Sequence, residues 1–225
     1  MNQLNKFILG EITMTVPSSY YQFYRQDILQ FIPETYSRVL EIGCASGKFR
    51  ANLKAKNEYW GVELDPSVAA EAQHVLDKVL VGRYEEVSDE LPDGYFDLVV
   101  CNDVIEHMPD HDAFLRDIQL KMAPKGHIVI SVPNVRFIWN LWELLVEKDW
   151  QYCDAGVLDR THLRFFTLKS LRRSLEAANY DIKMITHLNT FKPGPKIKRV
   201  IYYLLPILLG RDIPYLHVGA LVQKQ

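Results

Sequence analysis

The sequence VLEIGCASGKF, residues 39–49, is typical of a short buried strand that runs directly into a tight turn and then a helix. Most of its first residues are apolar, as expected for a strand that is covered on both faces. Gly43 and Gly47 then provide a turn whose backbone can adopt positive φ or lie close to a ligand. Because helix N–H groups at the carboxyl end of a parallel strand bind nucleotides, the sequence predicts a ligand site at this turn.

Two details of the turn indicate which ligand binds, and a third residue is expected at the ribose of that ligand. Ala45 stands in the second glycine place of the dinucleotide fingerprint G-x-G-x-x-G and the third glycine is missing, so the turn matches NAD poorly. Glu41, two residues before Gly43, would repel a pyrophosphate but suits a cation such as the amino group of a methionine moiety. Glu63 lies at the end of the next expected strand, where a carboxylate can accept hydrogen bonds from both ribose hydroxyls.

Glu41, Gly43 and Gly47 resemble the first motif of the class I S-adenosylmethionine (SAM) dependent methyltransferases, an acidic residue followed by alternate glycines. The resemblance covers about residues 39–132 and resumes near Phe166. It implies SAM as the cofactor, whereas the ribose role is one that SAM and NAD share. Arg83 replaces the acidic residue that usually meets the adenine, so either Tyr84 is expected to stack on the adenine or backbone groups are expected to bind it. The full set expected at the cofactor is Arg25, Glu41, Gly43, Ala45, Gly47, Glu63, Leu64, Tyr84 and Asn102.

Apolar runs and helix signals alternate along the chain, which predicts an α/β fold with a mainly parallel sheet. The resemblance implies a seven-stranded Rossmann-like sheet with helices on both faces and an antiparallel seventh strand. Strands are expected at residues 39–42, 58–64, 78–81, 95–102, 127–132, 180–187 and 217–223. Helices are expected at residues 20–31, 48–56, 66–76, 110–122 and 167–179, with Asp65 and Thr167 as caps of two of them.

The composition places limits on organisation and partners. At 225 residues and 48% hydrophobic, the chain is expected to form a single domain over residues 1–225. A net charge of −2 disfavours a nucleic-acid partner. Three scattered cysteines without a C-x-x-C pair indicate neither a disulfide framework nor a zinc site, so a reducing, cytoplasmic location is expected. The apolar runs are too short for a signal peptide or a membrane span.

Residues 133–165, which follow the fifth expected strand, are too many for a simple connection and are expected to form a substrate lid. The second half of this insertion mixes aromatic residues with Asp154, Asp159, Arg160 and His162. That mixture suits a carbohydrate or another polyhydroxylated ligand, although aromatic packing under a long loop explains it equally simply. It also resembles methyltransferases of cell-envelope glycan pathways.

Catalytic residues are expected just after the fourth strand and in the insertion. An aliphatic hydroxyl is nearly as weak an acid as water, so its methylation needs a general base or a divalent metal. Asp103-x-x-Glu106-His107 resembles the E-x-x-E-H metal site of the ubiquinone and small-RNA O-methyltransferases, and His162 matches the later histidine of the small-RNA enzymes. Two interpretations stay open: these four residues bind a divalent cation such as Mg²⁺, or His162 or His107 acts as a metal-free base, with Asp103 beside them.

Residues 192–209 combine basic residues with an apolar stripe at helical spacing. A basic amphipathic helix over residues 192–210 could bind a membrane surface peripherally or dock a partner, and packing in the core or in a dimer is the alternative.

The sequence as a whole predicts a SAM-dependent methyltransferase that acts on a hydroxyl of a sugar-containing or similarly polar small acceptor. A quinone-type or phenol-type acceptor, an NAD-dependent nucleotide-sugar oxidoreductase and a catalytically silent SAM-binding partner are the alternatives.

Overall fold

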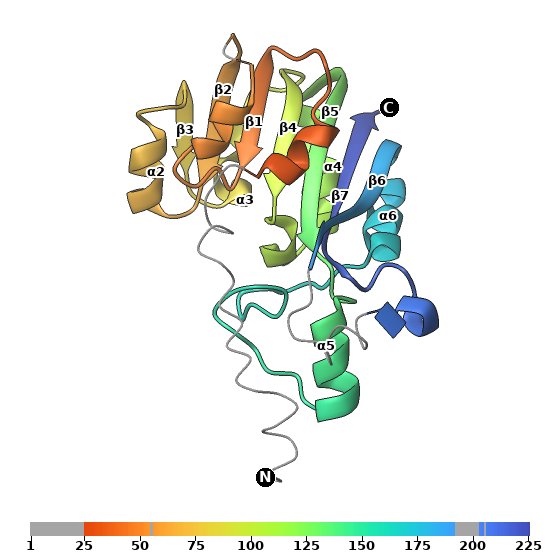
Figure 1. The fold of residues 1–225 in the computed structure, drawn as a ribbon. Coiled ribbons are helices and arrows are strands. Elements are labelled where there is room, and N and C mark those ends of the chain that lie inside the picture. Colours follow the sequence, from red (N-terminus) through yellow and green to blue (C-terminus); the bar gives the residue numbers. More distant parts are fainter. Residues whose placement is uncertain (1–24, 55, 192–202, 205) are drawn as a thin grey trace.

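The computed structural model describes residues 25–54, 56–191, 203–204 and 206–225, and its centre is a seven-stranded sheet (Figure 1). The strand order is β3-β2-β1-β4-β5-β7-β6. All neighbouring strands are parallel except β7, which is antiparallel to both β5 and β6. The strands are β1 (Arg38–Ile42), β2 (Glu58–Glu63), β3 (Lys78–Val81), β4 (Phe96–Asn102), β5 (Met122–Pro133), β6 (Tyr180–Thr190) and β7 (Tyr215–Lys224). The predicted sheet is therefore confirmed, including its antiparallel seventh strand.

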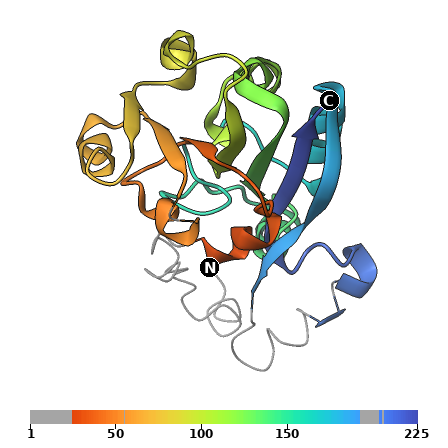
Figure 2. The same cartoon turned by 90° about the horizontal axis from the view of Figure 1, so that it is seen from above.

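Helices cover both faces of the sheet (Figure 2). Along β4, Val99 and Cys101 join one buried cluster while Leu98 and Val100 join the other, because successive side chains of a strand point to opposite faces. The first face is covered by α3 (Tyr84–Val87), α4 (His111–Lys121) and α6 (Leu168–Ala177), and the second by η2 (Gln26–Phe31), η3 (Lys48–Asn52) and α2 (Pro66–Ala72).

Polar caps fix where the helices begin. The carboxylate of Asp65 accepts a hydrogen bond from the Ser67 N–H at 2.8 Å, and the hydroxyl of Thr167 accepts one from the Ser170 N–H at 3.1 Å. Both side chains satisfy N–H groups that have no partner within the first helical turn. The two predicted caps are confirmed.

Several predicted elements differ in extent from the structure, among them the helix expected over residues 66–76, which ends at Ala72. The part of the expected helix 20–31 that is described is the short 3₁₀-helix η2, which buries Ile28 and Phe31 under the sheet, and residues 20–24 lie outside the described residues. The helix expected over residues 48–56 is limited to η3. Strand β5 begins at Met122, earlier than expected, because Met122 pairs with Phe96 at the start of β4.

The insertion, residues 133–165, begins with α5 (Ile138–Trp142) and the π-helix η6 (Glu143–Glu147). It has a small core of its own, formed by Phe137, Ile138, Trp139 and Val157 with Ile213, which precedes β7. The insertion lies beyond the carboxyl ends of the parallel strands (Figure 1). Within the described ranges, no helix has the length and apolar character needed to cross a membrane.

Candidate functional site

A cavity of about 280 Å³ opens at the carboxyl ends of β1 and β4. The sheet order reverses direction between these two strands, and such switch points are where open α/β sheets bind ligands. The walls of the cavity come from the turn after β1, the end of β4, the residue before η2 and the insertion. The lining residues are Arg25, Glu41, Gly43, Cys44, Ala45, Lys48, Phe49, Asn102, Asp103, His107, Gly156, Asp159 and His162.

The turn after β1 has the backbone conformation that its glycines predict. Gly43 and Gly47 have φ of 69° and 75°, and a Cβ at Gly43 would lie 2.6 Å from Val104 Cγ2. Ala45 also has a positive φ, 44°, which a residue with a Cβ adopts only when its surroundings hold it there. Ala45 therefore adopts a backbone conformation that glycine takes with less strain.

Glu63, at the end of β2, holds Ala45 in place. One carboxylate oxygen accepts a hydrogen bond from the Ala45 N–H at 2.8 Å, and the other accepts one from the Asp65 N–H at 2.9 Å. A carboxylate has about four lone-pair positions, so acceptor capacity remains for a ligand. Glu63 does not itself line the cavity but contacts a residue that does.

Glu41 is a buried acid beside the cavity. Its carboxylate accepts a hydrogen bond from the Tyr59 hydroxyl at 2.8 Å. Burial raises the pKa of Glu41 to about 8, and the hydrogen bond from Tyr59 opposes this shift only in part. A cationic group of a ligand placed beside it would favour the ionised form and lower that pKa.

Two polar side chains near the cavity have buried atoms with no hydrogen-bond partner among the described residues. Both amide atoms of Asn102 are unpaired, and so are both carboxylate oxygens of Glu106. Burial, followed by the nearby charge of Asp103, raises the pKa of Glu106 well above its ordinary value. Because buried polar atoms in folded proteins are almost always paired, these atoms indicate groups that a ligand satisfies.

His162, from the insertion, presents an unprotonated nitrogen to Glu106. Its Nδ1 lies 3.0 Å from the Val157 carbonyl oxygen, which can only accept, so Nδ1 carries the proton of the neutral ring. The lone pair is then on Nε2, which lies 3.9 Å from Glu106 Oε1. The insertion is fastened at this point by the N–H groups of Leu163 and Arg164, which both donate to the Glu106 carbonyl oxygen.

His107 is oriented in the same way by Thr161 and Asp159. The Thr161 hydroxyl donates to Asp159 at 2.6 Å, so it can only accept from His107 Nδ1, which lies 3.1 Å away. Nε2 of His107 is therefore unprotonated in the neutral ring. Desolvation beside the cavity, with His162 as the second cause, lowers the pKa of His107.

The side-chain ligand atoms of Glu106, His107 and His162 lie within 4.8 Å of one another. A carboxylate with two imidazole Nε2 atoms is a donor set that divalent transition metals bind, whereas Mg²⁺ prefers oxygen ligands. The unpaired oxygens of Glu106 fit such an ion.

Asp103 is held apart from this group by other partners. Its carboxylate pairs with Arg25 and accepts a hydrogen bond from the Ser131 hydroxyl at 2.9 Å, and His217 Nε2 lies 3.9 Å away. Burial by itself raises the pKa of Asp103, but Arg25, His217 and the Ser131 hydrogen bond together hold it below its ordinary value. Of the four predicted metal ligands, Asp103 is thus already paired with Arg25, and Glu106, His107 and His162 are the three whose ligand atoms lie close together.

The structure corrects the predicted role of Tyr84. Its ring is buried edge-on against Phe114, and its hydroxyl donates to Asp117 at 2.6 Å, so no ring face is open for adenine stacking. Leu64 is exposed beyond β2 and is not part of the cavity lining, nor is Gly47.

Sequence reasoning missed several residues around the cavity. Lys48 and Phe49 follow the turn directly and could have been inferred from it. Ser131 and His217 carried no such signal, because they come from β5 and β7 and meet Asp103 only in the folded sheet.

Comparisons with known proteins agree with this geometry. Residues 18–184 match the family described as "Methyltransferase domain". The ubiquinone biosynthesis O-methyltransferase of Aeromonas salmonicida is 30% identical over 174 residues, which cover 71% of this chain and 72% of that protein. The trans-aconitate 2-methyltransferase of Deinococcus radiodurans is 29% identical over 125 residues, which cover 52% of this chain and about half, 48%, of that protein.

A solved SAM-dependent methyltransferase from Archaeoglobus fulgidus has the same fold, with a TM-score of 0.63 at 21% identity over 99% of this chain and 94% of that one. The sheet order, the glycine turn with its acid and the family match all point the same way. The chain belongs to the class I SAM-dependent methyltransferases.

Proposed function

We propose that this methyltransferase acts on a hydroxyl oxygen of a small polar acceptor, such as a sugar-containing molecule, and that His162 removes the hydroxyl proton. The observation that carries the proposal is the unprotonated Nε2 of His162, fixed by the Val157 carbonyl beside the cavity. SAM, when bound, supplies a methyl group on a positively charged sulfur. The proton taken up by His162 makes an imidazolium, which Glu106 at 3.9 Å stabilises once it is ionised.

The proposed cofactor site uses the residues around the β1 turn. Glu41 faces the amino group of the methionine part, while Gly43, Ala45 and Gly47 shape the backbone that approaches it. Glu63 accepts hydrogen bonds from the ribose hydroxyls with the lone pairs that Ala45 and Asp65 leave unused. Arg25 and Asn102 lie on the same cavity wall, and the unpaired amide of Asn102 supports a ligand contact there.

Replacing Glu63 with alanine should weaken SAM binding at least tenfold, because loss of a charged acceptor costs about 1.5–3 kcal/mol. Isothermal titration measures the affinity, and thermal melting confirms that the variant folds. Asp65→Ala is the matched control, since it removes an acid two residues away that only caps α2 and should cost about 1 kcal/mol of stability without changing the affinity. Unchanged affinity in Glu63→Ala would contradict the ribose assignment.

A quinone-type or phenol-type acceptor is the second candidate, supported by the relatives that are named ubiquinone biosynthesis O-methyltransferases. A phenol, with a pKa near that of tyrosine at about 10, needs less help from a base than an aliphatic hydroxyl. Methyl transfer to paired sugar and catechol acceptors, followed with SAM labelled in the methyl group, separates the two classes.

A divalent cation is the alternative to a metal-free base, and Glu106, His107 and His162 would hold it. The ion would lower the pKa of a bound hydroxyl. In that case a chelator should abolish activity, Mn²⁺ or Zn²⁺ should restore it, and metal analysis should find an ion in the wild type that His162→Ala lacks. Full activity after chelation, with no metal retained, would exclude this version and leave the metal-free base.

A further inference from the structure

Residues 203–204 and 206–209 are helical and carry a stripe of exposed apolar side chains that the cavity does not use. The stripe consists of Tyr203, Leu204, Ile207 and Leu208, which share one helix face because they are spaced by one and four residues. Ile207 and Leu208 are 79% and 77% exposed. The alternative of packing in the protein's own core therefore does not hold for these residues.

The charge of the sequence on either side of the stripe indicates what kind of partner covers it. Between residues 192 and 211 the sequence has five basic residues and no acidic one. Arg211 is exposed in the structure, and the other four, Lys192, Lys196, Lys198 and Arg199, lie outside the described residues. Exposed apolar side chains with basic neighbours are typical of elements that rest on an anionic lipid surface.

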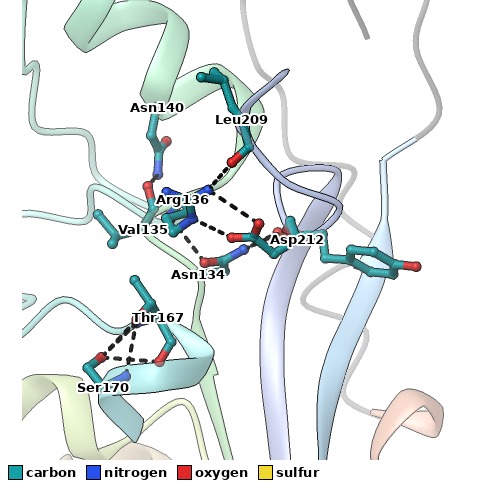
Figure 3. A network of polar contacts seen from close by, with 9 residues as sticks. Asn134, Val135, Arg136, Asn140, Thr167, Ser170, Leu209 and Asp212 are labelled. Atoms are coloured by element: carbon teal, nitrogen blue, oxygen red, sulfur yellow. Dashed lines mark hydrogen bonds and ion pairs between the residues drawn. The ribbon is translucent and has the colours of Figure 1, made fainter. Parts of the chain in front are cut away.

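Leu209 and Asp212, which follow the stripe in sequence, are hydrogen-bonded to the start of the insertion (Figure 3). Arg136 donates to the Leu209 carbonyl oxygen at 2.5 Å and pairs with Asp212, and the amide of Asn134 donates to the Asp212 carbonyl oxygen at 3.1 Å. Because β7 is antiparallel, the segment that precedes it lies at the same edge of the sheet as the carboxyl ends of β1 and β4. The stripe and the cavity are thus at the same end of the molecule.

We infer that the stripe formed by Tyr203, Leu204, Ile207 and Leu208 is a docking surface for an anionic membrane. The inference goes beyond the proposed reaction and does not depend on the acceptor, because vesicle binding is measured without one.

The insertion supplies a matched control. Leu144 and Leu145 on η6 are also exposed, 45% and 60%, but their neighbours Glu143, Glu147 and Asp149 are acidic, so the inference assigns them no membrane contact.

The experiment is co-sedimentation of the full chain with vesicles of phosphatidylglycerol and phosphatidylcholine at low salt. We expect the chain to bind these vesicles and added salt to weaken the binding. Vesicles of phosphatidylcholine alone should not bind it. The double variant Ile207→Ser/Leu208→Ser should bind at least about tenfold more weakly. Leu144→Ser/Leu145→Ser should bind as the wild type does, and SAM titration shows that each variant is folded.

Absence of binding to the anionic vesicles at low salt would overturn the inference, as would equal loss in both double variants. A wild-type dimer that Ile207→Ser/Leu208→Ser converts to a monomer, without vesicle binding, would instead assign the stripe to a second copy of the chain. A third variant, Arg211→Ala, keeps the apolar residues and should weaken binding through charge alone.

Discussion

Substituting alanine for His162 is expected to lower turnover about 100-fold or more while leaving SAM affinity unchanged. The expectation rests on the fixed tautomer of His162, a cavity-lining residue whose Nδ1 proton is held by the Val157 carbonyl and whose unprotonated Nε2 lies 3.9 Å from Glu106 Oε1. Single-turnover methyl transfer with saturating SAM measures the effect on the chemical step, and isothermal titration measures the effect on binding.

Two further variants make this result interpretable. Leu163→Ala changes an exposed neighbour in the same segment and should keep full activity. His107→Ala removes the second imidazole of the site, so it should lower turnover strongly only if His107 is the base. Full activity in His162→Ala together with a large loss in His107→Ala would transfer the role to His107, and full activity in both would leave the insertion with a binding role alone.

SAM affinity is expected to rise as the pH increases from about 6 toward 8, because Glu41 must lose a proton before it can pair with the amino group of the cofactor. The free protein holds the pKa of Glu41 at about 8 through burial, so below that pH the carboxyl is mostly neutral. A bound cation lowers this pKa, and binding therefore releases a proton, with up to tenfold affinity gained per pH unit below the free pKa. Above about pH 8 the gain should end, because a free α-amino group has a pKa of about 7.7–8.0 and loses its charge there.

Titration calorimetry in buffers of different ionisation enthalpy measures the released proton directly. Glu41→Gln should bind SAM at least tenfold more weakly near pH 8 and should lose the rising limb below pH 8, because it cannot ionise. The conservative change keeps the size of the side chain and an acceptor for the Tyr59 hydroxyl, so the fold should be preserved. A rising limb that persists in Glu41→Gln would show that another group titrates.

The sequence by itself determined the features that depend on neighbours along the chain. Apolar runs marked all seven strands because the strands bury side chains under the helices that cover the sheet. Gly43 and Gly47 marked the turn because few other residues adopt its positive φ. Asp65 and Thr167 were recognisable as caps for the same reason, since each bonds an N–H only two or three residues away.

Only the tertiary structure decided which of the candidate residues meet. Tyr84 packs in the core against Phe114 and donates to Asp117. Asp103 forms an ion pair with Arg25 and accepts a hydrogen bond from Ser131, and all these partners are distant in sequence. The imidazoles of His107 and His162 converge on Glu106 because the insertion folds back and donates two N–H groups to its carbonyl oxygen. Such contacts arise from the packing of whole elements, so no local pattern in the sequence encodes these contacts. The charge state of each side chain then follows from its burial and its neighbours in that packing.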